Sequence, residues 1–151
     1  MKPLRSPRLW LAFAGLVLLA AAARGPERST LHVRIEGLRN ADGSVHLGFY
    51  ESAAQWKTER SNFQRHASKS GCRGGVLELT ITDVAPGRYA MAMVDDENDS
   101  GGMDWGLLMP KEGFGFSNYE HRGLSRPDFE DFDFELPAGG EARVVMRVRY
   151  L

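Results

Sequence analysis

The stretch from Val94 to Gly106, "VDDENDSGGMDWG", places oxygen-bearing side chains at alternating positions directly after an apolar run. From its third residue the loop reads D-x-N-x-S-G-x-x-D. Calcium in proteins takes roughly six to eight oxygen ligands, and alternate side chains of a tightly curled loop can converge on one ion. The spacing therefore predicts a Ca²⁺ site formed by Asp96, Asn98, Ser100, the peptide oxygen of Gly102, and Asp104.

The resemblance to a calcium loop ends at the twelfth position, where Leu107 stands in place of a bidentate Glu. Water or a remote acid must therefore complete the coordination shell, and the candidate acids are Asp95, Glu97, Glu112 and Asp128. The alternative is an Asx-rich turn whose side chains bond their own backbone. Acid–base hydrolysis is a third interpretation, and it requires a cleft that separates the pKa values of paired carboxylates.

No other group of residues has the spacing of a catalytic or metal centre. His32 and His46 fall on the polar faces of expected strands, while His66 and His121 fall in expected loops, none at zinc-site spacing. Cys72 is the single cysteine, so no intrachain disulfide can form. Its Gly-rich surroundings suggest exposure, and self-association through this thiol or through a free strand edge is a further hypothesis.

Alternating polarity predicts the strands that must position the acidic loop. The segments 31–37 and 44–50 each alternate apolar and polar residues, and Asp42-Gly43 between them favours an antiparallel hairpin. Residues 88–94, "RYAMAMV", are apolar on both faces, which indicates a central strand directly before the loop. Further strands are expected over 76–82, 128–136 and 141–151, and a short one near 105–109.

About seven strands with frequent turns predict an all-β fold, a single antiparallel β-sandwich. Between the strands, 52–67 is expected to form a short helical crossover with Trp56 and Phe63 on one helical face. A long aromatic segment follows the acidic loop. Its Phe114, Phe116 and Tyr119 either cap the core or form a surface for a sugar or peptide.

The N-terminus predicts export. Residues 1–23 combine three basic residues with an apolar run that closes on alanines, which is the pattern of a secretory signal peptide. We expect a flexible segment over 24–30, a sandwich domain over 31–151, a periplasmic or secreted location, and no transmembrane segment after cleavage. Without Lys2, Arg5 and Arg8 the chain carries 16 basic against 20 acidic residues, which argues against a nucleic-acid partner.

Three stretches together resemble a bacterial family. The order of "GLRNADGSVHLGFYES", "VAPGRYAMAMVDDENDSGGMDWGLLMPKEGFGFSN" and "RPDFEDFDFEL" is similar to the domain of unknown function 2141 family, over roughly 31–151. The resemblance implies an exported all-β domain, immunoglobulin-like or transthyretin-like. Members commonly show D-E-N-x-N-G-x-x-D in the loop, and here Ser100 replaces the second Asn.

The sequence thus predicts an exported, non-catalytic binding or structural module of the bacterial envelope, stabilised by a divalent cation in the loop 95–104. Its expected partner is an envelope protein or a glycan. The alternative is a small carboxylate-dependent hydrolase or a carbohydrate-binding protein, with Asp96 or Asp104 as the reacting acid.

Overall fold

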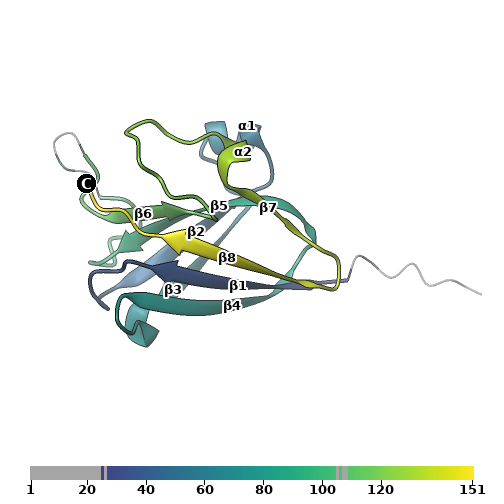
Figure 1. Cartoon of the computed structure of the whole chain (residues 1–151), viewed down its shortest axis with the longest axis horizontal. Coiled ribbons are helices and arrows are strands. Elements are labelled where there is room, and N and C mark those ends of the chain that lie inside the picture. The colour runs from purple at the N-terminus through teal and green to yellow at the C-terminus, as the bar shows by residue number, and fades with distance from the viewer. Residues whose placement is uncertain (1–24, 26, 105, 107–108) are drawn as a thin grey trace, which may run out of the picture.

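Two β-sheets face each other in the computed structural model, which describes residues 25, 27–104, 106 and 109–151. One sheet has the order β4-β1-β8, and the other has the order β3-β2-β5-β6 with β7 also paired to β5 (Figure 1). The strands are β1 (Ser29–Glu36), β2 (Ser44–Tyr50), β3 (Phe63–Ser68), β4 (Val76–Val84), β5 (Gly87–Asp96), β6 (Gly113–Phe116), β7 (Asp133–Leu136) and β8 (Glu141–Arg147). The prediction of an all-β sandwich is confirmed.

Some of the expected details lie outside the described residues or differ from them. The predicted signal peptide 1–23 and most of the strand expected near 105–109 lie outside the residues that the structure describes. β1 begins at Ser29, inside the segment expected to be flexible. The pairing of β1 with β8 is parallel, whereas the other ladders are antiparallel. None of the helices in the described part of the chain is long and apolar enough to cross a membrane.

The predicted hairpin between the first two strands is wrong, because β1 and β2 lie in different sheets. The connection between them is seven residues long, from Gly37 to Gly43, which is enough to pass from one sheet to the other. Gly43 has φ +70° and lies against the backbone at Asp96, so close that an added Cβ would sit 2.1 Å from the Asp96 carbonyl oxygen. The glycine allows this close approach where β2 begins beside the end of β5 in the same sheet, and it does not form a two-residue hairpin.

The predicted helical crossover is only partly correct. A five-residue helix, α1 (Ala53–Lys57), begins after Ser52, whose hydroxyl accepts the Gln55 amide. The chain then forms strand β3, which pairs with β2 over its full length. Phe63 therefore stacks on Phe49 with ring centroids 4.0 Å apart, instead of sharing a helical face with Trp56. Hydrogen bonding to β2 makes this segment a strand, although the seven-residue spacing of Trp56 and Phe63 is also compatible with a helix.

Apolar side chains form two separate clusters. The main core fills the space between the sheets, with Leu31, Leu47, Tyr89, Met91 and Met146 almost fully buried. A second cluster lies on the outer face of the five-stranded sheet, where α1 and α2 (Phe129–Phe132) cover it: Tyr50, Trp56, Ala90, Phe116, Phe129 and Phe132. β5 contributes to both clusters, which explains why its sequence is apolar on both faces and confirms its central place.

Candidate cation site at the end of strand β5

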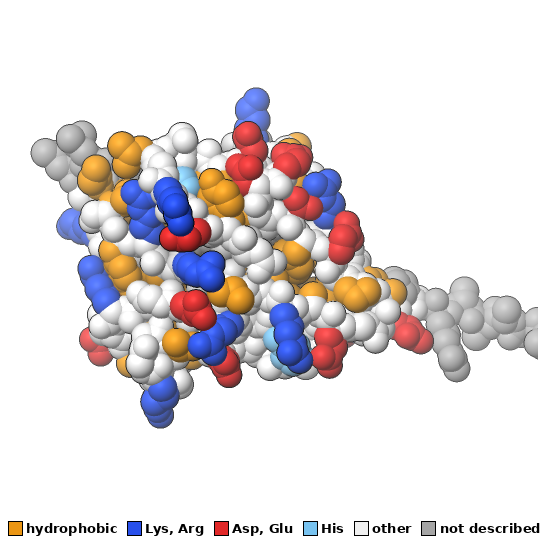
Figure 2. Space-filling view, in the orientation of Figure 1, with side chains coloured by type: hydrophobic (Ala, Val, Ile, Leu, Met, Phe, Trp, Pro, Cys, Tyr) orange, Lys and Arg blue, Asp and Glu red, His pale blue; other side chains and the backbone are white. Residues whose placement is uncertain are grey.

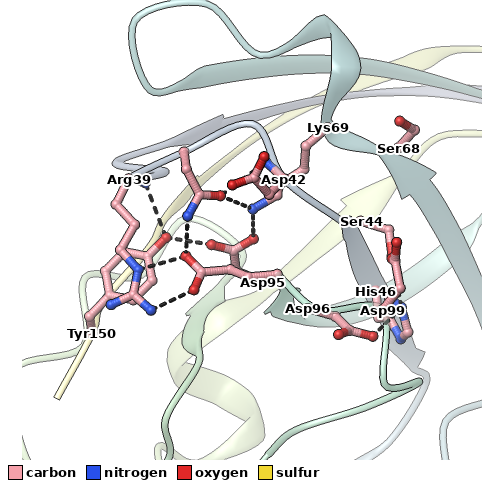
Figure 3. A network of polar contacts seen from close by, with 12 residues as sticks. Arg39, Asp42, Ser44, His46, Ser68, Lys69, Asp95, Asp96, Asp99 and Tyr150 are labelled. Carbon is pink, nitrogen blue, oxygen red and sulfur yellow. Dashed lines mark hydrogen bonds and ion pairs between the residues drawn. The ribbon is translucent and has the colours of Figure 1, made fainter.

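β5 ends with two consecutive acids that face opposite ways, because successive side chains of a strand alternate. Both side chains are fully buried. Asp95 points toward Lys69 and Tyr150, whereas Asp96 points toward His46 and the acidic loop (Figure 3). The end of a central strand thus supplies two chemically distinct environments that are one residue apart.

Asp96 organises the beginning of the acidic loop. Its Oδ1 accepts the amide of Ser100 at 2.9 Å, and its Oδ2 accepts the amide of Gly101 at 2.8 Å. Gly101 has φ +100°, a conformation that favours glycine and allows the loop to curl back over the carboxylate. Burial raises the pKa of Asp96, but the two amides together with His46 and Glu112 outweigh it and hold the pKa below its ordinary value.

The remaining predicted ligands also come together. Asp104 accepts hydrogen bonds from the Asn98 amide at 2.7 Å and from the Ser100 hydroxyl at 3.2 Å. The same hydroxyl lies 3.3 Å from the carbonyl oxygen of Gly102. All five residues that the sequence selected therefore lie in one curled loop, where their polar groups bond one another.

Glu112, the residue directly before β6, completes this group. Its side chain is buried, with the whole residue 4% exposed, and Oε2 accepts the Asp104 amide at 3.0 Å. Oε1 has no hydrogen-bond partner among the described residues. Burial raises the pKa of Glu112, and the nearby charges of Asp96 and Asp104 raise it further, while the backbone amides of Asp104 and Glu97 oppose the shift. A buried carboxylate with a free oxygen thus lies against two further acids.

The other remote acids considered from the sequence are already engaged. Glu97 accepts two hydrogen bonds from Arg39, at 2.6 and 2.5 Å, and the arginine lowers the pKa of this carboxyl. Asp128 caps the N-terminus of α2 in a capping box with Asp131. Asp95 pairs with Lys69 on the far side of β5. Glu112 alone among these acids faces the loop with an oxygen to spare.

The environment of Asp95 is a buried polar network that the sequence analysis missed (Figure 3). Lys69 is fully buried, and its Nζ forms an ion pair with Asp95 Oδ1 at 2.5 Å and donates to Asn40 Oδ1 at 2.9 Å. The Tyr150 hydroxyl donates to Asp95 Oδ2 at 2.5 Å. Burial and this carboxylate raise the pKa of Tyr150 far above its ordinary value. Asn40 and Lys69 are 29 residues apart, so no local sequence pattern links them.

His46 was also missed as a neighbour of the site, because its place on a polar strand face predicted a surface residue. Its Nε2 lies 3.2 Å from Asp96 Oδ2, and its ring stacks on His66 with centroids 3.9 Å apart. Burial and His66 lower the pKa of His46. The expected exposure of Cys72 is wrong: the residue is 8% exposed and belongs to the main core, because the short 3₁₀ turn 69–71 folds it inward.

The loop as it stands is a self-bonded turn with spare oxygens. Within the described residues, no three His, Cys, Asp or Glu side chains form a preformed metal cluster. The acidic loop instead has oxygens of mixed type, from carboxylate, amide, hydroxyl and peptide groups. Hard cations such as Ca²⁺ prefer this donor set, and Ca²⁺ tolerates irregular geometry. The residues present therefore fit calcium better than zinc, which takes nitrogen and sulfur ligands.

The fold and this loop define a β-sandwich domain with an acidic corner at the end of its central strand. The family model described as "Uncharacterized protein conserved in bacteria (DUF2141)" matches residues 33–144, so the chain belongs to this family. The resemblance stated from the sequence motifs is thereby confirmed. No curated protein and no solved structure matches the chain.

Proposed function

We propose that this protein is an exported, non-catalytic binding or structural module of the bacterial envelope whose acidic corner binds Ca²⁺. The observation that carries the cation proposal is Glu112, whose buried Oε1 has no partner among the described residues and lies beside two other acids. A buried carboxylate oxygen without a partner is costly. A cation would remove that cost.

The proposed coordination shell combines the loop with this remote acid. Its ligands are Asp96, Asn98, Ser100, the peptide oxygen of Gly102, Asp104 and Glu112. Glu112 takes the role that a calcium loop ordinarily gives to the acid at its twelfth position, although it lies further along the chain, directly before β6. A divalent ion would offset the repulsion among the three carboxylates and stabilise the folded domain by mass action.

Two observations favour a non-catalytic module over a carboxylate-dependent hydrolase. Hydrogen bonds from two backbone amides help to hold the pKa of Asp96 below its ordinary value, so this carboxyl group is ionised and cannot act as a general acid near neutral pH. Asp96 and Asp104 line neither the surface hollow at Trp56 nor the one at Arg147. Export to the periplasm or the cell exterior is supported by the leader pattern of 1–23, and an envelope protein or glycan is the partner that such a location favours.

Thermal unfolding with calcium and with a chelator tests the cation site. We expect millimolar Ca²⁺ to raise the unfolding midpoint by several degrees, since a ligand at 100 times its Kd stabilises by about 2.7 kcal/mol. Glu112→Gln should remove most of this gain and lower the calcium affinity measured by titration calorimetry at least tenfold. The matched control is Glu135→Gln, an exposed acid on β7, which should keep the full response.

The calcium titration also separates a ligand role from a structural role for Glu112. Circular dichroism of Glu112→Gln in chelator should match that of the parent protein, because the change only neutralises a buried charge. A parent protein with no calcium heat and no midpoint shift would refute the cation site. Calcium binding that survives Glu112→Gln unchanged would refute the assigned ligand.

A further inference from the structure

An apolar hollow lies on the outer side of the five-stranded sheet, beside the second apolar cluster. Its volume is about 570 Å³, and its wall includes Trp56, Val94, Phe114 and Phe116. The large hydrophobic residues that remain exposed in the described part of the chain are Met109, Leu124 and Leu151, and all three line this hollow. Exposed apolar side chains that gather around one concavity mark a binding surface rather than random surface composition.

A second hollow of about 650 Å³ adjoins the first and has a different character. Its wall contains Arg122, Arg147 and Arg149, and it shares His121 with the apolar hollow. Blue arginine and lysine side chains lie beside orange hydrophobic ones at the end of the molecule where β8 ends (Figure 2). An apolar wall and a basic wall thus meet at one histidine.

The basic wall has cationic charge to spare. Arg122 pairs with Glu120 at 3.1 Å, and Arg147 lies 3.7 Å from Glu36, so two carboxylates of this hollow are matched by two arginines. Arg149 donates to the carbonyl oxygens of His121 and Gly123. It takes part in no ion pair with any residue that the structure describes.

We propose that the two hollows together bind a single-chain amphiphile, with its apolar chain in the hollow at Trp56, Phe114 and Leu124 and its carboxylate or phosphate head on the arginines. Guanidinium groups recognise both kinds of head with paired hydrogen bonds. The volume of the apolar hollow lies within the roughly 300–1,000 Å³ typical of small-molecule sites. This proposal does not depend on the cation site.

The shape of the site favours a small amphiphile over a protein partner. Protein interfaces are broad, and a stable one buries roughly 800 Å² on each side. Here the exposed apolar residues surround a concavity with aromatic walls. Glu59 and Arg126 also line this concavity but pair with each other at 2.8 Å, so the unmatched charge lies on the side of the basic hollow. An apolar chain with one charged end matches this one-sided arrangement.

Binding to the purified protein is measured with ligands that share a twelve-carbon chain, below their micellar concentrations. Dodecanoate and dodecyl phosphate are the anionic ligands, dodecyltrimethylammonium is the cationic one, and acetate and inorganic phosphate represent the heads alone. We expect the anionic amphiphiles to bind at least tenfold more tightly than the cationic one, and the head groups alone not to bind. A stronger response to dodecyl phosphate than to dodecanoate would assign a phosphate head, and the reverse order a carboxylate.

Variants separate the two parts of the site. Leu124→Asp changes a residue that is 79% exposed, so the fold should persist while the affinity for every chain-bearing ligand falls at least tenfold. Arg149→Gln removes the arginine that has no ion pair among the described residues, so it should abolish the preference for anionic heads and leave the cationic amphiphile unaffected. The control is Arg65→Gln, an exposed residue on the edge strand β3. The proposal fails if no chain-bearing ligand binds, if head charge makes no difference, or if Leu124→Asp binds as the parent does.

Discussion

At the scale of single residues, the stability of this fold depends on a buried polar network centred on Lys69. Its ammonium group is fully buried between Asp95 and Asn40. An ion pair that has lost its water is sensitive to the removal of one partner, because the other charge remains without compensation. The same network anchors the C-terminal segment after β8 through Tyr150, whose hydroxyl donates to Asp95 and accepts the Arg39 amide.

We therefore expect Lys69→Met to lower the free energy of unfolding by about 3–5 kcal/mol. Urea denaturation in excess calcium measures the loss. The control is Lys57→Met, an exposed lysine in the last turn of α1, which should change stability by less than about 0.5 kcal/mol. The double variant Lys69→Met with Asp95→Asn should recover part of the loss. Equal stability of Lys69→Met and Lys57→Met would contradict the role of the buried pair.

At the scale of elements, the link between β1 and β2 is joined to the end of β5 by a close backbone contact at Gly43. The Lys69 amide donates to the Gly43 carbonyl at 3.2 Å, so the turn before β2 also meets the 3₁₀ turn after β3. These contacts hold together the segments that carry Asn40, Lys69 and Asp96. A change at this glycine should therefore disturb both the buried network and the acidic loop.

Gly43→Ala tests this packing, with Gly74→Ala as a matched control. Both glycines have positive φ, +70° and +57°, so both changes incur the left-handed backbone penalty of about 1–2 kcal/mol. An added Cβ at Gly74 meets nothing within 4 Å, whereas at Gly43 it meets the Asp96 carbonyl. We expect Gly43→Ala to cost about 1–3 kcal/mol more than Gly74→Ala in urea denaturation. Equal losses would show that the close approach does not matter.

At the scale of the whole molecule, the acidic corner and the apolar hollow share one segment of chain. Asp104 and Glu112 are proposed calcium ligands, while Met103, Met109 and Pro110 from the same segment line the hollow. A cation that fixes the two acids would fix one wall of the hollow as well. Binding at either place should therefore strengthen binding at the other.

This coupling rests on both proposals and is measured as a ratio of affinities. We expect calcium to tighten dodecanoate binding by about fivefold or more, and dodecanoate to tighten calcium binding by the same factor. Glu112→Gln should bind dodecanoate equally well with calcium and with chelator. Two ligands that each bind without changing the affinity for the other would show that the sites are independent, while leaving each proposal intact.

The acidic loop could be predicted from the sequence because its contacts are local. Asp96, Asn98, Ser100 and Asp104 lie within nine residues, so their spacing alone brings the oxygens together. Strand β5 was equally clear, since a strand covered on both faces needs apolar residues at every position. The same holds for the all-β class, which follows from two-residue alternation in segment after segment.

Contacts between distant segments could not be predicted in this way. A single sequence does not say that β1 pairs with β8 or that 63–68 is a strand, because pairing depends on which edges are left free once the sheets stack. Lys69 could not be assigned to Asp95 for the same reason, and the two hollows arise only where the 120–127 loop and the C-terminal residues meet over the sheet.

The sequence by itself determined an all-β domain of this bacterial family, a central strand, and an acidic loop whose polar side chains lie together. Only the tertiary structure decided which remote acid joins that loop, since Glu112 reaches it by pairing β6 beside β5. It also decided that Cys72 is buried and that a lysine lies in the interior. The physical reason is range: side-chain alternation and ligand spacing act over a few residues, whereas burial depends on what the rest of the chain places nearby.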